Sequence, residues 1–164
     1  MKKYTLMDTD TKVLFGRKLF RIKANISFGN VKEGDLGGYV EKEKNLDMSD
    51  NAWVSGNAKV SGNAEVYGDA EVSGDAKVSG NAWVSGDAKV SGNAKAKKSP
   101  IVLINACKWN ITKTDNMVQV GYVQKTPEEW IEWLDGKDEF ETKRGTIEFK
   151  KIEKCIRFLC EVVL

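Results

Sequence analysis

Residues 52–96 read AWVSGN AKVSGN AEVYGD AEVSGD AKVSGN AWVSGD AKVSGN AKA, a six-residue motif repeated without interruption. A strict short period of this kind indicates a solenoid, in which each repeat packs on its neighbours. The Ala-x-Val-Ser part alternates apolar and polar residues, as a half-buried strand does. The Gly-Asn or Gly-Asp pair that follows supplies residues that tolerate the backbone of a corner. Each motif therefore predicts one short strand and one corner.

The repeat also fixes which residues share a position. Its valine position recurs every six residues from Val54 to Val90 and decays at Ala96. Upstream, the same spacing places Met48 at the valine position and Leu46 at the alanine position. A helix is excluded, because glycine recurs in every motif and the apolar spacing does not match 3.6 residues per turn.

These residues resemble the hexapeptide-repeat, left-handed parallel β-helix superfamily over roughly residues 46–97. Members of that superfamily place three hexads in each coil, so residues 18 apart would stack at about 4.8 Å and the segment would form about three coils. More closely, the chain resembles uncharacterised phage and prophage proteins in three pieces. They are the segment Gly34–Val40, the Val-x-Gly-Asn-Ala run and the segment Asp115–Gly121. This resemblance implies a mobile-element origin and brings no established activity.

The predicted fold class is therefore mainly β: a short left-handed parallel β-helix between an N-terminal β cap and a C-terminal α+β unit. The three parts are assigned to residues 1–45, 46–98 and 99–164. In the first part, residues 12–15 and 19–23 flank Gly16 and predict a hairpin. An open solenoid end exposes unpaired backbone, so a capping element is expected there.

The C-terminal part combines strand-like and helical segments. Residues 101–104, 109–112 and 117–123 are strand-like. Thr126, Pro127 and Glu129 form a capping box with proline at the first helical position, which predicts a helix to about Leu134. A second helix is predicted from about Thr146. Its apolar stripe consists of Ile152, Ile156, Leu159 and Val163.

Composition excludes several classes of protein. Lysine and arginine total 26 against 24 acidic residues, and a formal charge of +2 argues against a dedicated DNA-coating protein. Three cysteines are too few for a disulfide scaffold. No apolar run approaches the roughly 18 residues of a membrane span, and the chain start lacks a signal-peptide core. We expect no membrane partner and a cytoplasmic location, in a bacterial host if the protein is phage-encoded.

Histidine is absent altogether. The acyltransferases of the superfamily typically use a histidine base, and its carbonic anhydrases hold zinc with three histidines, so the resemblance implies neither activity here. Glu65 and Glu71 could serve as an acid–base pair, but they occupy an outward position where a solvated face is the favoured interpretation. We therefore expect no catalytic residue, no metal and no cofactor.

The outward positions carry the candidate binding residues. Eighteen residues per coil would align Lys59, Lys77 and Lys95 in one column, which either extends into solvent or is matched by an anion. Trp53 and Trp83 also stand at outward positions, and Tyr67 replaces a serine. Exposed tryptophans on a polar repeat indicate a partner, either another subunit or a stacked ligand.

Together these features predict a non-catalytic, phage-type binding protein that forms a homo-oligomer, with a trimer favoured. Its ligand would be a small anion, such as a host-defence nucleotide signal, sequestered between subunits. The predicted binding residues are Lys59, Lys77, Lys95, Trp53, Trp83 and Tyr67. Two alternatives stay open: a structural solenoid that spaces its end domains, and a histidine-free transferase acting on a nucleotide-linked substrate.

Overall fold

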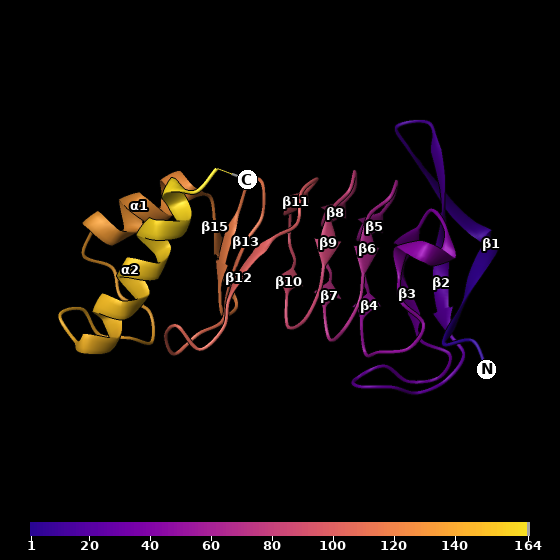
Figure 1. The fold of residues 1–164 in the computed structure, drawn as a ribbon, viewed down its shortest axis with the longest axis horizontal. Helices are drawn as coiled ribbons and strands as arrows, with labels where there is room; N and C mark the ends of the chain where they lie inside the picture. Colours follow the sequence, from indigo (N-terminus) through magenta and orange to yellow (C-terminus); the bar gives the residue numbers. More distant parts are fainter. Residues whose placement is uncertain (164) are drawn as a thin grey trace.

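The computed structural model describes residues 1–163. Along its long axis lie an N-terminal hairpin, a central solenoid, and a C-terminal sheet covered by two helices (Figure 1). The prediction of a mainly β fold with a solenoid of about three coils and a helical C-terminal unit is confirmed. Neither helix is long and apolar enough to cross a membrane, within the residues that the structure describes.

Each hexad contributes one two-residue strand to the solenoid. Strands 18 residues apart pair in parallel, so that Val54 faces Val72 and Val72 faces Val90. Backbone bonds such as Ser55 N–H to the Val72 carbonyl, at 2.8 Å, join successive coils. The solenoid strands are β4 (Trp53–Val54), β5 (Lys59–Val60), β6 (Glu65–Val66), β7 (Glu71–Val72), β8 (Lys77–Val78), β9 (Trp83–Val84), β10 (Lys89–Val90) and β11 (Lys95–Ala96).

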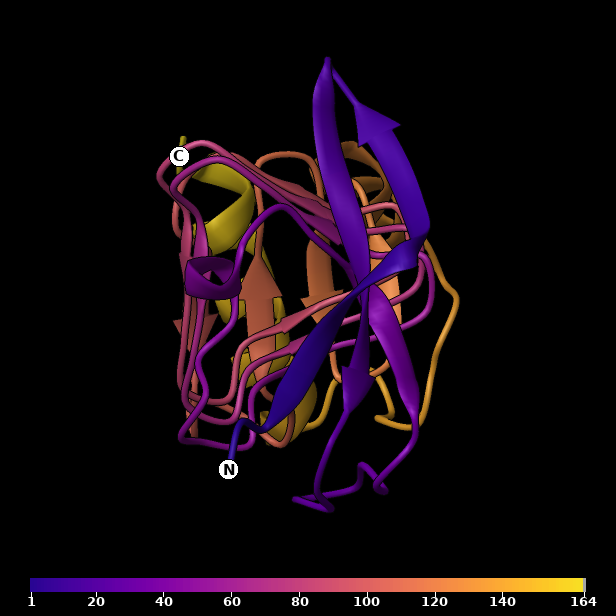
Figure 2. The ribbon, with the colours of Figure 1, turned by 90° about the vertical axis from the view of Figure 1, so that its right-hand side faces the viewer.

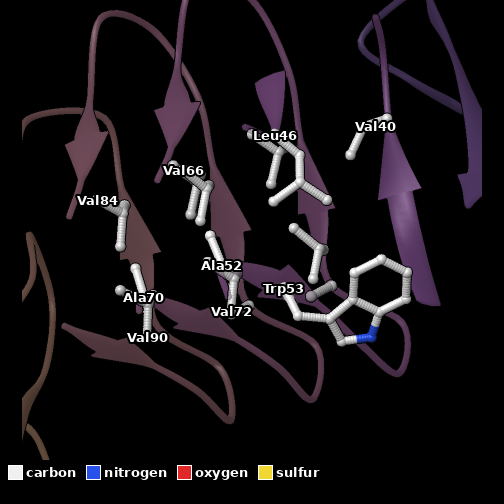
Figure 3. Close-up of a cluster of buried hydrophobic side chains, with 14 of the residues drawn as sticks. Val40, Leu46, Ala52, Trp53, Val66, Ala70, Val72, Val84 and Val90 are labelled. Carbon is white, nitrogen blue, oxygen red and sulfur yellow. The ribbon is translucent and has the colours of Figure 1, made fainter. Parts of the chain in front are cut away.

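The interior of the solenoid is a narrow apolar core. Every alanine of the repeat from Ala52 to Ala94, and every valine from Val54 to Val90, is at most 1% exposed. Figure 3 shows some of these side chains, such as Ala70, Val72 and Val84, directed into one interior from the surrounding strands. At the corners, glycines such as Gly74 take a positive φ of 66°, a conformation that side chains with a Cβ disfavour. The small residues of the hexad thus fit both the core and the corner.

The N-terminal segment extends the stack of strands. Strands β1 (Tyr4–Leu14) and β2 (Arg17–Ala24) form an antiparallel hairpin with a two-residue turn at Phe15 and Gly16. Strand β3 (Leu36–Val40) pairs antiparallel with β2 and parallel with β5. It therefore joins the hairpin to the first coil. A single 3-10 turn, η1 (Glu43–Asn45), follows β3.

The predicted register upstream of the repeat is wrong. Leu46, and not Met48, pairs with Val66, and it is 1% exposed. Val40 likewise pairs with Val60, 20 residues away. Val40 and Leu46 keep the six-residue spacing, and two additional residues lie between Leu46 and Val54. Asp47 accepts hydrogen bonds from the backbone N–H groups of Ser49 and Asp50 there, which stabilises the longer turn.

The C-terminal unit is an antiparallel four-stranded sheet with two helices. The strands are β12 (Ile101–Leu103), β13 (Ile111–Lys113), β14 (Val118–Val120) and β15 (Val123–Lys125). A turn at Gly121 divides the predicted segment 117–123 into two strands. Helix α1 (Pro127–Asp135) has the predicted capping box at Thr126. Helix α2 (Ile147–Glu161) starts after Thr146 as predicted, but Val163 lies beyond its end and is 93% exposed.

Both non-repetitive motifs of the sequence lie at the ends of the solenoid. At the N-terminal end, a Cβ on Gly38 would lie 2.7 Å from the Ala58 carbonyl oxygen, so only glycine allows β3 to approach the first coil. At the C-terminal end, Asn116 Oδ1 accepts the Lys95 N–H at 2.7 Å, and Asp115 Oδ2 accepts the Lys97 N–H at 2.8 Å. These side chains satisfy donors that would otherwise need a further coil. The segments Gly34–Val40 and Asp115–Gly121 therefore cap the solenoid.

Candidate anion-binding face

The outward residues of the solenoid lie on three separate faces. One face follows β3, β5, β8 and β11 and carries Tyr39, Lys59, Lys77 and Lys95. The second follows β4, β7 and β10 and carries Trp53, Glu71 and Lys89. The third follows β6 and β9 and carries Glu65 and Trp83. The six candidate binding residues are therefore distributed over all three faces of one chain.

Only the first of these faces carries a run of like charges. Lys59, Lys77 and Lys95 are direct register partners on neighbouring strands. On the second face Lys89 pairs with Glu71 at 3.5 Å, so the two charges of that column have opposite signs. In residues 1–163, no carboxylate lies within 4.0 Å of the ammonium groups of the three stacked lysines. Within the described part of the chain none of the three therefore forms an ion pair, although the charge of Asp75 acts on Lys59.

The N-terminal hairpin adds two cations next to this column. Tyr39 is the register partner of Lys59 on one side and of Arg21 on the other. Lys12 Nζ lies 4.2 Å from the centroid of the Tyr39 ring, and the Arg21 guanidinium carbon lies 5.1 Å from it. We call the surface formed by Lys12, Arg21, Lys59, Lys77 and Lys95 the cationic face.

Sequence reasoning missed Lys12, Arg21 and Tyr39 as part of this surface. Their signal was a surplus of four positive charges in residues 1–45, which did not show where those charges lie. Asp10 partly balances the hairpin end, because its carboxylate accepts the Tyr39 hydroxyl at 3.1 Å and lies 3.9 Å from Arg21 Nε. That separation is too long for a hydrogen bond, and Arg21 Nε is buried without a partner in the described residues.

Lys59 lies at the centre of the cationic face. Partial burial lowers the pKa of its ammonium group below the ordinary lysine value, and the charges of Lys12 and Lys77 lower it further, whereas Asp75 opposes them. Lys59 Nζ donates to the Asn57 carbonyl at 3.0 Å, and Lys12 Nζ donates to the Asn57 side-chain oxygen at 3.1 Å. Asn57 thus holds two ammonium groups close together. An anion placed between them would relieve their mutual repulsion.

The aromatic candidates lie elsewhere. The prediction that Trp53 is exposed is wrong, because it is only 8% exposed and packs edge-on against Tyr4 and Phe28 at centroid distances of 6.3 and 5.4 Å. The N-terminal segment covers its face of the solenoid. Trp83 is 57% exposed and Tyr67 is half-buried, both on the third face. Within one chain, neither can stack on a ligand bound to the lysine column.

The two carboxylates considered as an acid–base pair lie on the other two faces of the solenoid. Glu65 pairs with Lys44 at 3.0 Å and Glu71 with Lys89, so each of these carboxylates has a cation partner. Among the described residues, no group of three or more histidine, cysteine or acidic side chains could hold a metal ion.

No protein-family model matches the chain, and no curated protein matches it.

Proposed function

We propose that this chain is a non-catalytic, phage-type binding protein that holds a small multiply charged anion, of phosphate or nucleotide type, on the cationic face. The observation that carries the proposal is the lysine column without internal carboxylates, next to Lys12 and Arg21. Several ammonium groups that converge on one phosphate bind it through charge-assisted hydrogen bonds. In this proposal the solenoid serves as a rigid support that sets the spacing of the cations.

Stability gives no reason for this column to exist. At the strand spacing of about 4.8 Å, two like charges repel by about 0.9 kcal/mol in bulk water. The Glu71–Lys89 pair on the second face relieves such repulsion within the same repeat. The hexad therefore accommodates acids at this position, and the lysine column keeps only cations. Binding of an external anion explains this difference between the faces.

The proposal includes an oligomer, with three chains favoured. Recognition of a nucleotide base commonly uses an aromatic side chain that stacks on it. Trp83 and Tyr67 are on a different face from the lysines, so they could contribute to such a site only from a second copy of the chain. A phosphate would then contact the lysines of one copy, and a base would contact the aromatic side chain of another.

Isothermal titration calorimetry of wild type, Lys77→Glu and Lys89→Glu tests the proposal. The probes are inorganic pyrophosphate and a panel of linear and cyclic nucleotides. Lys77 and Lys89 occupy the same position of the hexad on different faces, so the second variant is a matched control. We expect wild type to bind at least one probe, with an affinity that falls as salt rises. Lys77→Glu should abolish this binding and Lys89→Glu should preserve it, with melting temperatures close to that of wild type.

Two results contradict the proposal: no heat from wild type with any probe, or equal affinity in Lys77→Glu and wild type. Either would favour the second candidate, a structural spacer. The observation behind that candidate is the set of hydrogen bonds that fixes the C-terminal unit to the last coil, such as Lys95 N–H to Asn116. A rigid solenoid with firmly attached ends would hold the hairpin and the helical unit at a constant separation.

A further inference from the structure

The tip of the β1–β2 hairpin projects beyond the solenoid, as Figure 2 shows. It carries two exposed apolar side chains, Val13 at 75% and Phe15 at 91% exposure. Other apolar side chains are also exposed, such as Ile147 at 77%, but Val13 and Phe15 lie together on a protruding tip, where they can enter a partner's surface. The tip is therefore a candidate for docking on another molecule.

The backbone of the tip supports this interpretation independently. Phe15 and Gly16 have φ values of 49° and 76°, so both central residues of the turn are left-handed. Such two-residue turns favour Asn-Gly, because asparagine tolerates this conformation and a bulky aromatic residue does not. Phe15 takes the disfavoured conformation and is almost fully exposed within its own chain. A residue that violates local preference without a gain inside the chain is typical of a functional position.

The third face of the solenoid contains a matching groove of about 620 Å³. The apolar side chains that it exposes are those of Met48, Tyr67 and Trp83, and Trp83 is 57% exposed. Four acidic residues also line the groove, against one lysine. They are Glu43, Asp47, Asp50 and Glu65, and the lysine is Lys44. The groove thus combines the surface of two aromatic side chains and one methionine with an acidic rim.

The tip has the complementary charge. Residues 12–18 read KVLFGRK and contain three basic and no acidic residues. Part of the charge on both surfaces is matched within the chain. In the tip, Arg17 pairs with Glu41. In the groove, Glu43 pairs with Lys2, and Glu65 pairs with Lys44. Among the described residues, Lys18 has no carboxylate within 4.0 Å, and Asp47 and Asp50 have no cation within that distance. An apolar tip beside one cation without an acidic partner fits a groove whose rim includes two acids without a cation partner.

We propose that the hairpin tip of one copy docks in the Trp83 groove of a second copy, with Phe15 packed against Trp83. The contact is between chains, because the tip belongs to the sheet that contains β3 and β5. The elements that line the groove, η1, β6 and β9, lie on another side of the solenoid (Figure 2). Each copy then offers one tip and one groove. A head-to-tail contact of this kind closes as a ring when the rotation between copies allows it, and the trimer of the proposed function is one such ring. This inference rests on the oligomer in the proposed function but not on the anion, and it assigns Trp83 to the contact between chains in place of a contact with a nucleotide base.

Light scattering coupled to size exclusion tests the contact at micromolar concentration. We expect wild type to have a mass well above the 18.3 kDa of one chain. Phe15→Asn should be monomeric. Its melting temperature should be at least that of the other monomeric variant, Trp83→Lys, because asparagine suits the turn. Trp83→Lys, which installs a residue that the hexad carries elsewhere, should also be monomeric. Phe158→Asn removes a side chain that is 55% exposed on α2, and this control should keep the wild-type mass.

A mixture of the two monomeric variants gives the sharpest result. The Trp83→Lys chain keeps an intact tip and the Phe15→Asn chain keeps an intact groove, so an equimolar mixture should form dimers and nothing larger. A monomeric wild type, an oligomeric Phe15→Asn, or a mixture that stays monomeric would each overturn the proposal. Pyrophosphate titration of Phe15→Asn separates this inference from the proposed function, because the cationic face lies within one chain. Binding by a wild type that does not assemble would overturn this contact and the oligomer but leave the anion site on the cationic face standing. Assembly without binding would leave this contact standing and overturn the anion site.

Discussion

Replacing Gly74 with alanine tests how closely successive coils approach one another. Gly74 has a φ of +66°, and a Cβ placed there would lie 2.9 Å from the backbone nitrogen of Gly92 and 3.2 Å from its Cα. The next coil cannot move away freely, because Ser73 N–H donates to the Val90 carbonyl at 2.9 Å and Asp75 N–H to the Gly92 carbonyl at 3.0 Å. The methyl group would therefore stretch hydrogen bonds on both sides of the corner.

Gly86 provides a matched control in the same hexad position. Its φ is +57°, but a Cβ there would have no atom within 4 Å, because no further coil covers this corner. Gly86→Ala should therefore cost only the left-handed conformation, about 1–2 kcal/mol. Gly74→Ala should cost the same amount plus overpacking of about 1–3 kcal/mol. The expected difference between the two variants is about 1–3 kcal/mol in the free energy of unfolding.

Urea unfolding followed by circular dichroism and tryptophan fluorescence measures both free energies. The slope of the unfolding free energy against urea should be unchanged, since neither substitution alters the surface exposed on unfolding. Equal losses in the two variants would refute the idea that inter-coil contact, in addition to the positive φ, requires glycine at these corners. A larger loss at Gly86 would show that the order of the coils is wrong.

Two further predictions concern the core and the cationic face. Val72→Asp should prevent folding, because an unpaired carboxylate in this fully buried column costs several kcal/mol. Ser73→Asp, at the next residue, should leave the melting temperature almost unchanged, because Ser73 points outward. Similar melting temperatures of the two variants would contradict the assigned orientation of these side chains. Anion affinity should fall as pH rises through the Lys59 pKa, which lies below the ordinary value of 10.5, since deprotonation removes a positive charge. Lys59→Arg should move this fall to higher pH, because arginine stays protonated, and an unshifted titration would exclude Lys59 as its source.

The repeat made the central fold predictable because its local and global requirements coincide. Alanine and valine alternate with polar residues, glycine recurs at every corner, and the same spacing specifies the stack of strands. The helix boundaries at Thr126 and Thr146 were equally readable, because capping side chains act within one turn of the chain. Prediction failed at Met48, where two additional residues shift the register. An insertion in a turn has no periodic signal of its own.

Trp53 and Trp83 show why the candidate site was only partly predictable. Both occupy the same position in the hexad Ala-Trp-Val-Ser-Gly, so the sequence of the repeat assigns them the same environment. Trp53 is nevertheless covered by Tyr4 and Phe28, whereas Trp83 is exposed. The difference comes from residues that are far from both in sequence. Local patterns therefore indicate which side chains point outward, and only the tertiary structure shows which of them remain uncovered.

The same reasoning applies to the cationic face. The hexad places Lys59, Lys77 and Lys95 in a column, but a regular column of like charges does not by itself define one binding site. The hairpin defines such a site, because Lys12 and Arg21 flank Tyr39 next to the first lysine of the column. The repeated residues thus set a regular spacing of charge, and the non-repeated residues turn that spacing into a local site. Selectivity for a particular anion should accordingly depend more on Lys12 and Arg21 than on the lysines of the repeat.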